Sequence, residues 1–452
     1  MDSVRIGLDF GTTNSGAAVF DGQNVRILPL DPLSHDPGVI RSTLYITRDH
    51  QVFIGQEAID TYYRQNTGRP SRMVRQYVGE IELTFAEVGT FVKDVYVLVD
   101  ELTPGRLLYS LKSELTSGYE GTTIFGRYYE LEELIARYLR EIRHRVEAET
   151  GQAVGGVVLG RPVNFVGGGT EADSQRAENR LRRAAEMAGF RDIAFELEPV
   201  AAALHYELTA NRPQNVIVFD FGGGTLDITA IRIGEGERRQ RHVFATGGVG
   251  IAGDVFDRRI IEGLMLDHFG RGSTWGEDAA PFPNQYIDAL VDWQTIPELG
   301  RPETLHFLEL AQITGSHPSR VRALESLLIN NYAIRLIDEV ERVKVALSTA
   351  HFALIRLTGQ DMDVWQPLTR SQFEALIAEA ARRIEACLLD TLERSGLGVD
   401  EVDAVVRTGG SAQIPYFIEM MGRMFDPDKV VLSDVFSGVT AGLAIRAHAI
   451  QG

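Results

Sequence analysis

The chain has 452 residues, of which 44% are hydrophobic, so it can form two or three domains with full cores. Its 45 Lys and Arg residues against 63 Asp and Glu residues give a net charge of −18, which disfavours nucleic acid and anionic membranes as principal partners. Because Cys387 is the single cysteine, an internal disulfide is excluded. A cytoplasmic protein without signal peptide or membrane span is expected, with metals, nucleotides or proteins as partners.

The N-terminal segment 4–20, VRIGLDFGTTNSGAAVF, predicts an apolar strand, a turn of small residues after Asp9 and a second apolar strand. Short strand-like runs follow at Ser42–Ile46 and Val52–Ile54, and a helix is expected from Gln56. The region 62–126 has no clear strand or helix pattern of apolar residues.

Lys112 lies in this region, within the run LLYSLKSEL between residues 107 and 115. On the residue types alone, a solvated lysine on a helix is the ordinary interpretation.

Strands and helices alternate in the next part of the chain. The apolar residues of Leu131–Val146 recur at helical spacing, and Val154–Pro162 reads as a buried strand. A helix is expected from Ser174 after the glycine loop Gly167–Gly169, and Gly189 can cap its end. This alternation predicts an α/β architecture.

Glu198 and Pro199 precede the small-residue run Val200–Ala203, which favours a closely packed helix. A glutamate at a helix N-terminus can simply interact with the helix dipole. It can also face a cleft and order a water molecule. The residue types leave both alternatives open.

The segment 216–231, VIVFDFGGGTLDITAI, predicts a buried strand, a glycine turn and a second strand. Glycines at Gly222–Gly224 allow backbone N–H groups to approach an anion, and Thr225 adds a hydroxyl donor. Because Asp220 would repel a bare phosphate, a magnesium ion with its waters is expected between them. The alternative is a tight hairpin whose glycines serve only the turn.

The Asp-Phe-Gly turns at Asp9 and Asp220 are similar, and each opens its half of the chain. Two copies of one supersecondary unit suggest two similar lobes that face each other across a cleft. A phosphate chain held from both sides would lie there.

Gly248, Gly250 and Gly253 have the spacing of a dinucleotide-binding motif, followed by Asp254 and a predicted helix. This signal is weak by itself, and no acidic partner on a following strand is evident. A phosphate loop is therefore predicted here, instead of a nicotinamide site.

A helix is expected from Asn331, and it places Glu341, Lys344 and Ser348 along one side. These residues could hold a ribose or a base edge, although a solvated ion pair is the ordinary explanation.

Three features are predicted near the C-terminus. A capping box at Thr369–Gln372 precedes a long amphipathic helix. A strand at Val402–Thr408 leads into the turn Gly409–Ser411, after which Pro415 opens a helix. The small-residue helix Gly438–His448 is expected to pack back on the first lobe.

Six segments together resemble the ATPase domain of the seventy-kilodalton heat-shock chaperones of the DnaK type. They occur in that family's order and approximate spacing, and they are IGLDFGTTNS, ELEPVAAALHY, VIVFDFGGGTLDIT, GDVFDRRI, EVERVKVALS and VRTGGSAQIP. The resemblance implies an actin-like, ribonuclease-H-like α/β fold with two lobes, each with a smaller subdomain, and MgATP in the central cleft.

The resemblance also implies roles for individual residues. Asp9, Asp220 and Glu198 would surround a hydrated magnesium ion, with K+ as a further candidate ion, and Lys112 and Glu198 would be catalytic together with both aspartates. The phosphate loops would be formed by Gly11, Thr12, Thr13, Asn14, Gly222, Gly223, Gly224, Thr225, Gly253 and Asp254. The adenosine contacts would be made by Glu341, Lys344, Val345, Ser348, Gly409, Gly410 and Ser411.

The chain departs from the family pattern at Val345 and Gln413, where the family has arginines, and at Phe436, where an acidic residue is expected. Lower purine affinity is the expected consequence. Lobe I is predicted at 1–210 with a smaller subdomain at 46–126 and with 430–452 packing on it. Lobe II is predicted at 211–429 with a smaller subdomain at 259–349. The sequence resembles a truncated branch of the family, for which no peptide-binding domain is expected.

The function expected from this resemblance is slow MgATP hydrolysis, with the nucleotide state acting as a conformational switch for a protein partner or co-chaperone. A sugar-type kinase of the same superfamily is one alternative. A non-hydrolysing nucleotide-binding scaffold is the other.

Overall fold

The computed structural model describes residues 4–67, 69, 72–85, 89–167, 170–235, 240–291, 296–433 and 437–450. Part of the predicted glycine loop 167–169 and the departure at Phe436 lie outside these residues. The chain divides into two compact units, of which one comprises Met1–Tyr62, Gly105–Phe256 and Ile377–Gly452 and the other comprises Tyr63–Pro104 and Asp257–Leu376. The predicted lobe and subdomain boundaries stay a prediction.

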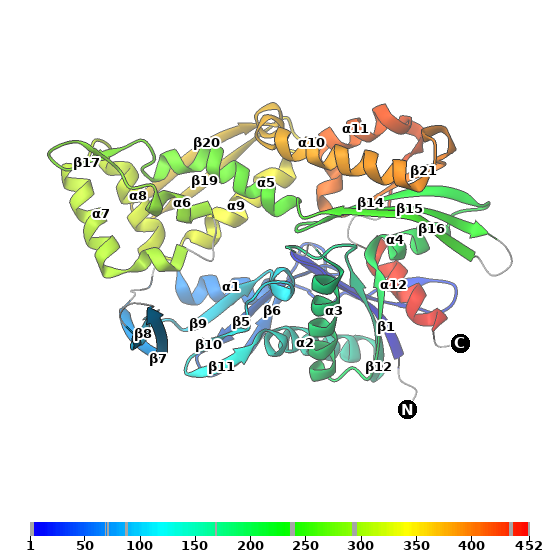
Figure 1. Cartoon of the computed structure of the whole chain (residues 1–452), viewed down its shortest axis with the longest axis horizontal. Helices are drawn as coiled ribbons and strands as arrows, with labels where there is room; N and C mark the ends of the chain where they lie inside the picture. Colours follow the sequence, from blue (N-terminus) through cyan, green and yellow to red (C-terminus); the bar gives the residue numbers. More distant parts are fainter. Residues whose placement is uncertain are drawn as a thin grey trace. The chain divides into compact units, whose positions relative to one another are not determined.

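The first unit contains two mixed sheets with the same connectivity (Figure 1). In each sheet, one strand pairs antiparallel with the next strand in the chain and parallel with a later strand. The first sheet has the order β13-β12-β1-β2-β3, with β4 paired to β2. Its strands are β1 (Val4–Phe10), β2 (Asn14–Phe20), β3 (Val25–Ile27), β4 (Ile40–Arg41), β12 (Val154–Arg161) and β13 (Asp192–Leu197).

The second sheet repeats this arrangement with the order β16-β15-β14-β21-β22. Its strands are β14 (Gln214–Phe221), β15 (Leu226–Glu235), β16 (Gln240–Val249), β21 (Ala404–Thr408) and β22 (Val430–Leu432). The strand-turn-strand units predicted at 4–20 and 216–231 are thus confirmed as equivalent parts of two similar sheets.

Two helices, α4 (Glu198–Glu207) and α12 (Gly438–Ala449), share one buried cluster with both sheets. The cluster includes Val158 of β12, Val218 of β14 and Leu443 of α12. Helix α12 also packs against β1 and β2, so the predicted C-terminal helix contacts the first sheet. This packing holds the two sheets in one unit.

The helices α2 (Leu131–Thr150) and α3 (Glu171–Ala188) pack on each other and complete the core of the first sheet. Helix α3 begins three residues before the predicted Ser174, because Thr170 and Asp173 form a capping box at its N-terminus. It ends at Gly189, whose φ of 98° is the left-handed conformation that the predicted cap requires.

The first unit also contains a smaller three-stranded sheet and its neighbours. These elements are β5 (Thr43–Thr47), β6 (Val52–Ile54), β9 (Gly105–Tyr109), the 3-10 helix η1 (Leu111–Leu115), β10 (Gly121–Ile124) and β11 (Arg127–Glu130). Helix α1 (Gly55–Asn66) follows β6, where the sequence predicts a helix from Gln56.

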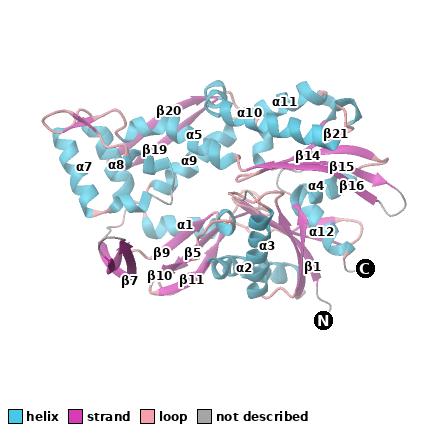
Figure 2. Ribbon diagram, in the orientation of Figure 1, coloured by secondary structure: helices cyan, strands magenta, loops and turns pink. Residues whose placement is uncertain are grey.

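The second unit contains helices, hairpins and a two-stranded ribbon (Figure 2). Its strands are β7 (Met73–Phe85), β8 (Gly89–Asp100), β17 (Thr274–Trp275), β18 (Ala280–Pro281), β19 (Phe352–Gly359) and β20 (Met362–Thr369). Its α-helices are α6 (Gln285–Asp288), α7 (Pro302–Thr314), α8 (Pro318–Ile329) and α9 (Ala333–Ala346). Helix α9 begins two residues after the predicted Asn331, because Asn331 has a φ of 57°.

The remaining α-helices are α5 (Gly253–Ile260), α10 (Arg370–Ser395) and α11 (Pro415–Phe425). The predicted capping box before α10 is confirmed, because the Thr369 backbone N–H donates to Gln372 and the Gln372 N–H donates back to Thr369. Among the described residues, no helix combines the length and apolar character that a membrane crossing requires.

The contact between α12 and α4 is close because Gly442 has no side chain. A Cβ atom added there would lie 1.7 Å from the Ala201 carbonyl oxygen. We expect Gly442→Ala to lower the free energy of unfolding by about 2 kcal/mol, since backbone atoms must move to accept the methyl group. Urea unfolding followed by circular dichroism measures this change.

The matched control is Gly118→Ala, because an added Cβ atom at Gly118 meets nothing within 4 Å. This variant should unfold at the wild-type urea concentration. Equal unfolding midpoints for the two variants would contradict the tight helix contact.

Candidate functional site

The turn between β1 and β2 lies against the turn between β14 and β15 in the first unit. A Cβ atom added at Gly223 would lie 1.9 Å from Thr13 Oγ1, and one added at Gly224 would lie 2.6 Å from Thr12 Oγ1. Side chains at these two positions would fill the space beside the threonine hydroxyls. Gly11 and Asn14 flank the threonines, and the Gly11 carbonyl accepts a hydrogen bond from Ser42 at 2.7 Å.

Two further loops form hydrogen bonds with the Gly222–Gly224 turn. The Asp254 backbone N–H donates to the Gly223 carbonyl at 2.8 Å, and the Gly253 N–H donates to the Gly222 carbonyl at 3.4 Å. Ser411 Oγ donates to the same Gly222 carbonyl at 2.7 Å. The structure therefore brings together four of the predicted loops, including the one at Gly409–Ser411.

The turn residues fit a phosphate group. Thr13 Oγ1 is buried and has no hydrogen-bond partner among the described residues. A buried hydroxyl without a partner costs free energy, and a phosphate oxygen would satisfy it. Glycines opposite the hydroxyl leave the room that such a group needs.

Lys112 and Glu198 form a buried ion pair in the same unit. Lys112 Nζ lies 2.6 Å from Glu198 Oε1, and the exposed fractions of the two side chains are 6% and 11%. Lys112 comes from η1, and Glu198 is the first residue of α4. The interpretation of Lys112 as a solvated lysine is wrong, because its side chain is buried in this ion pair. The pair could not be inferred from neighbouring residues, since Glu198 lies 86 positions away in the sequence.

Buried carboxylates surround this pair. Burial is the main cause that raises the pKa of Asp9 to about 7, and Glu198 raises it further while Lys112 lowers it. Burial also raises the pKa of Asp220 well above its usual value, with Glu198, Asp227 and Asp9 adding to the effect. Burial lowers the pKa of Lys112, but Glu198 and Asp9 raise it above its usual value overall.

Asp227 belongs to this cluster, although the sequence analysis did not single it out. It lies on β15 directly opposite Asp220, and its carboxylate accepts the Val163 backbone N–H at 2.7 Å. Burial and Glu198 raise its pKa to about 7. The available signal was an aspartate between Leu226 and Ile228 in a strand predicted to be buried.

The carboxylates suit a cation that keeps its water ligands. Among the described residues, no three His, Cys, Asp or Glu side chains are placed to ligate one metal ion directly. Magnesium keeps several waters and contacts few carboxylates, so Asp9 and Asp220 fit such an ion through water. Glu198, which is already paired with Lys112, would contact its waters.

The predicted adenosine contacts on α9 belong to the second unit. Lys344 Nζ lies 2.6 Å from Asp257 Oδ2, and both side chains are largely buried, so this lysine is not solvated. Val345 is 61% exposed. Ser348 follows α9, where its backbone N–H donates to the Val345 carbonyl. The part that these residues and Glu341 play in a nucleotide site stays a prediction.

The raised pKa of Asp9 predicts how the stability of the metal-free protein depends on pH. The folded protein binds the Asp9 proton more tightly than the unfolded chain, in which the pKa is 3.8. The resulting stabilisation is complete below pH 3.8 and is lost as the pH rises through about 7. With EDTA present, Asp9→Asn should remove about 4 kcal/mol of the stability loss between acidic and neutral pH.

Urea unfolding at pH values on both sides of this range measures the effect. Asp21→Asn is the control, because backbone N–H groups of Asn24 and Gln23 lower the pKa of the exposed Asp21. This variant should keep the wild-type pH dependence above pH 5. Parallel pH profiles for wild type and Asp9→Asn would contradict the burial of Asp9.

Two comparisons with known proteins identify the family of the chain. The family model described as Hsp70 protein matches residues 5–274 and 327–452. A curated chaperone protein dnaK from Gracilaria tenuistipitata var. liui is 26% identical over 462 residues, which cover 99% of this chain and 60% of that protein. The predicted resemblance and the actin-like α/β fold class are confirmed by these matches. The chain therefore belongs to the Hsp70 protein family.

Proposed function

We propose that this chain binds MgATP at the paired turns and hydrolyses it slowly, with the nucleotide state acting as a conformational switch for a protein partner. The observation that carries the proposal is the buried Lys112–Glu198 pair beside Asp9 and Asp220. Membership of the Hsp70 family supports ATP as the nucleotide. The chain spans 60% of the length of its dnaK relative, so the chaperone role is part of the proposal.

The phosphate chain would be held by groups that the first unit brings together. Backbone N–H groups of Gly223 and Gly224 and the hydroxyls of Thr12 and Thr13 would donate to its oxygens. Asp9 and Asp220 would hold the hydrated magnesium ion, which supplies positive charge to the phosphate oxygens.

Hydrolysis needs a positioned water molecule, and the ion pair suits that task. The ammonium group of Lys112 can donate to the water and to Glu198 at once, because it carries three protons. Glu198 is held in one orientation by Lys112 and can accept a hydrogen bond from the water. In phosphoryl transfer, such positioning and charge stabilisation make up most of the catalysis.

Recognition of the base is expected to be weaker than is usual in the family. On the second unit, the predicted adenosine contacts are Glu341, Lys344 and Ser348. Val345 and Gln413 stand where arginines are expected. An aliphatic side chain cannot make the cation–π contact that an arginine makes with a purine ring.

Variants of the catalytic residues test the ATPase proposal. We expect Lys112→Ala and Asp220→Asn each to lower kcat for phosphate release by about 100-fold, because each removes a group that acts on the reacting atoms. Arg26→Ala is the control, since Arg26 is half-exposed and pairs with Glu149 on the surface.

Phosphate release from MgATP is measured with and without a panel of sugars. Hydrolysis that is unchanged in both site variants would reject the site assignment. Formation of ADP that requires a sugar would instead favour a small-molecule kinase, and nucleotide binding without turnover would favour a scaffold.

The glycine turn gives a second test that depends on binding alone. Gly223→Ala should weaken ATP binding by about tenfold or more, because its Cβ atom would collide with Thr13. Gly222→Ala is the matched control, since its added Cβ atom meets nothing nearer than 4.0 Å. Titration with a fluorescent ATP analogue should separate the two variants. Equal affinities would place the phosphates elsewhere.

A further inference from the structure

The short helix that carries Lys112 needs support from outside. Helix η1 begins after Ser110, which has a φ of 52°, and no side chain caps its N-terminus. The last carbonyl groups of a helix have no partner within it. The position of Lys112 therefore depends on other residues that hold the last carbonyl groups of η1.

Arg180 of α3 adds hydrogen bonds at the end of η1, where the Glu114 carbonyl also accepts from the backbone N–H and the hydroxyl of Ser117. Its Nη1 group donates to the carbonyls of Glu114 at 3.3 Å and Leu115 at 3.4 Å. The same group lies 3.5 Å from the Ser117 carbonyl, and Nη2 donates to the Tyr119 carbonyl at 2.8 Å. One guanidinium group therefore binds four carbonyl groups between residues 114 and 119.

A buried carboxylate fixes the guanidinium group itself. Arg180 Nε donates to Glu132 Oε1 of α2 at 2.8 Å, and the exposed fractions of the two side chains are 15% and 12%. Burial alone would raise the pKa of Glu132, but the hydrogen bond from Arg180 lowers it below its usual value. Glu132 is therefore ionised at neutral pH and keeps Arg180 in one orientation.

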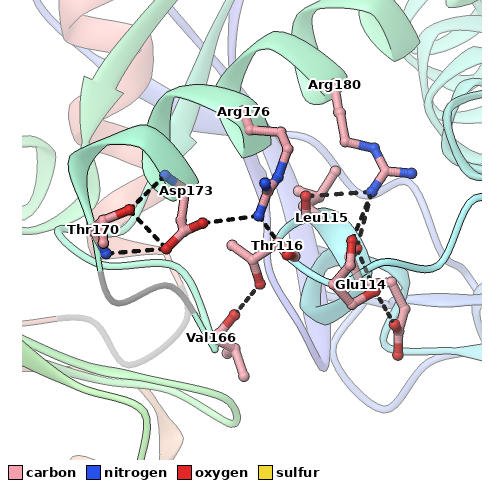
Figure 3. Close-up of polar contacts among 9 residues, drawn as sticks. Glu114, Leu115, Thr116, Val166, Thr170, Asp173, Arg176 and Arg180 are labelled. Atoms are coloured by element: carbon pink, nitrogen blue, oxygen red, sulfur yellow. Dashed lines mark hydrogen bonds and ion pairs between the residues drawn. The ribbon is translucent and has the colours of Figure 1, made fainter.

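A second set of contacts holds the neighbouring residue of the same turn (Figure 3). Arg176 Nη2 donates to the Thr116 carbonyl at 3.0 Å and to Asp173 at 2.8 Å. Thr116 Oγ1 donates to the Val166 carbonyl. These contacts place the turn between α3 and the loop that follows β12.

We propose that Arg180 is a positioning residue for hydrolysis, which holds Lys112 at Glu198 by capping the carbonyl end of η1. This inference rests on the proposed ATPase function. A misplacement of a catalytic group by about 1 Å can lower a rate about 100-fold, so a capping residue can control turnover without touching the nucleotide.

The contacts predict which kinetic constant depends on Arg180. In the described part of the chain, its acceptors lie on residues 114–119 and on Glu132, and the phosphate turns are not among them. Loss of Arg180 should therefore lower kcat and leave the KM for ATP unchanged.

An open cavity beside Arg180 allows the missing group to be replaced. Arg180 lines a cavity of about 480 Å³ together with Arg176, Arg183, Gln175 and other residues of α3 and α2. Guanidinium ion is small enough to enter this cavity in an Arg180→Ala variant. It carries the same planar set of N–H donors as the arginine side chain.

The experiment compares three variants in the full chain. Arg180→Ala and Arg180→Lys should each lower kcat by about 10- to 100-fold with KM unchanged, since an ammonium group cannot reproduce the planar fork. Low-millimolar guanidinium chloride should restore kcat in Arg180→Ala only. Arg183→Ala is the matched control on the same helix, because its exposed side chain pairs with Glu130, and its kcat should not change.

Wild-type kcat in Arg180→Ala and Arg180→Lys would overturn the inference, as would an equal loss in Arg183→Ala. Hydrogen exchange of the amides at residues 112–117 in the nucleotide-free protein gives a readout that does not need turnover. It should be faster in Arg180→Ala than in Arg183→Ala, and equal exchange would also overturn the inference. A further outcome is that wild-type protein releases no phosphate while hydrogen exchange is still faster in Arg180→Ala than in Arg183→Ala. In that case the ATPase proposal fails, but the role of Arg180 in holding η1 stands.

Discussion

The close packing of α12 against α4 is the contact on which the rest of the first unit depends. Both helices share one buried cluster with strands of both sheets, and Gly442 lets their backbones approach. Because the sheets have the same connectivity and a common helical layer, their first hairpins end near each other. The site between Thr13 and Gly223 thus follows from the packing of these two helices on both sheets.

The electrostatics of this site explain why it needs a cation. Asp220 and Asp227 are buried with Glu198, Asp9 is partly buried, and Lys112 is the cation that lowers the pKa of Asp9 and Asp220. Several buried carboxylates beside one ammonium group favour protonation or a bound positive ion. The same cluster that destabilises the empty protein at neutral pH is therefore suited to hold magnesium and phosphate when both are present.

The sequence allowed prediction of much of the fold, because apolar runs interrupted by glycine mark the hairpins at Asp9 and Asp220. The long β7–β8 ribbon was not predicted, since the apolar residues in that part of the sequence do not recur at a clear spacing. The burial of Lys112 could not be read from its neighbours, because its partner Glu198 comes from a distant helix. Asp227 was missed because Glu198 and the Val163 backbone N–H, which act on its carboxylate, come from distant segments.

The contact between the first strand and the last helix has a consequence for biosynthesis. Strand β1 packs against α12, and a Cβ atom at Gly7 would lie 2.1 Å from the Ala444 backbone nitrogen. A ribosome releases β1 long before residues 438–449 leave the exit tunnel. The nascent N-terminal half must therefore wait with part of its apolar surface uncovered until α12 has left the tunnel, and it is exposed to aggregation until then.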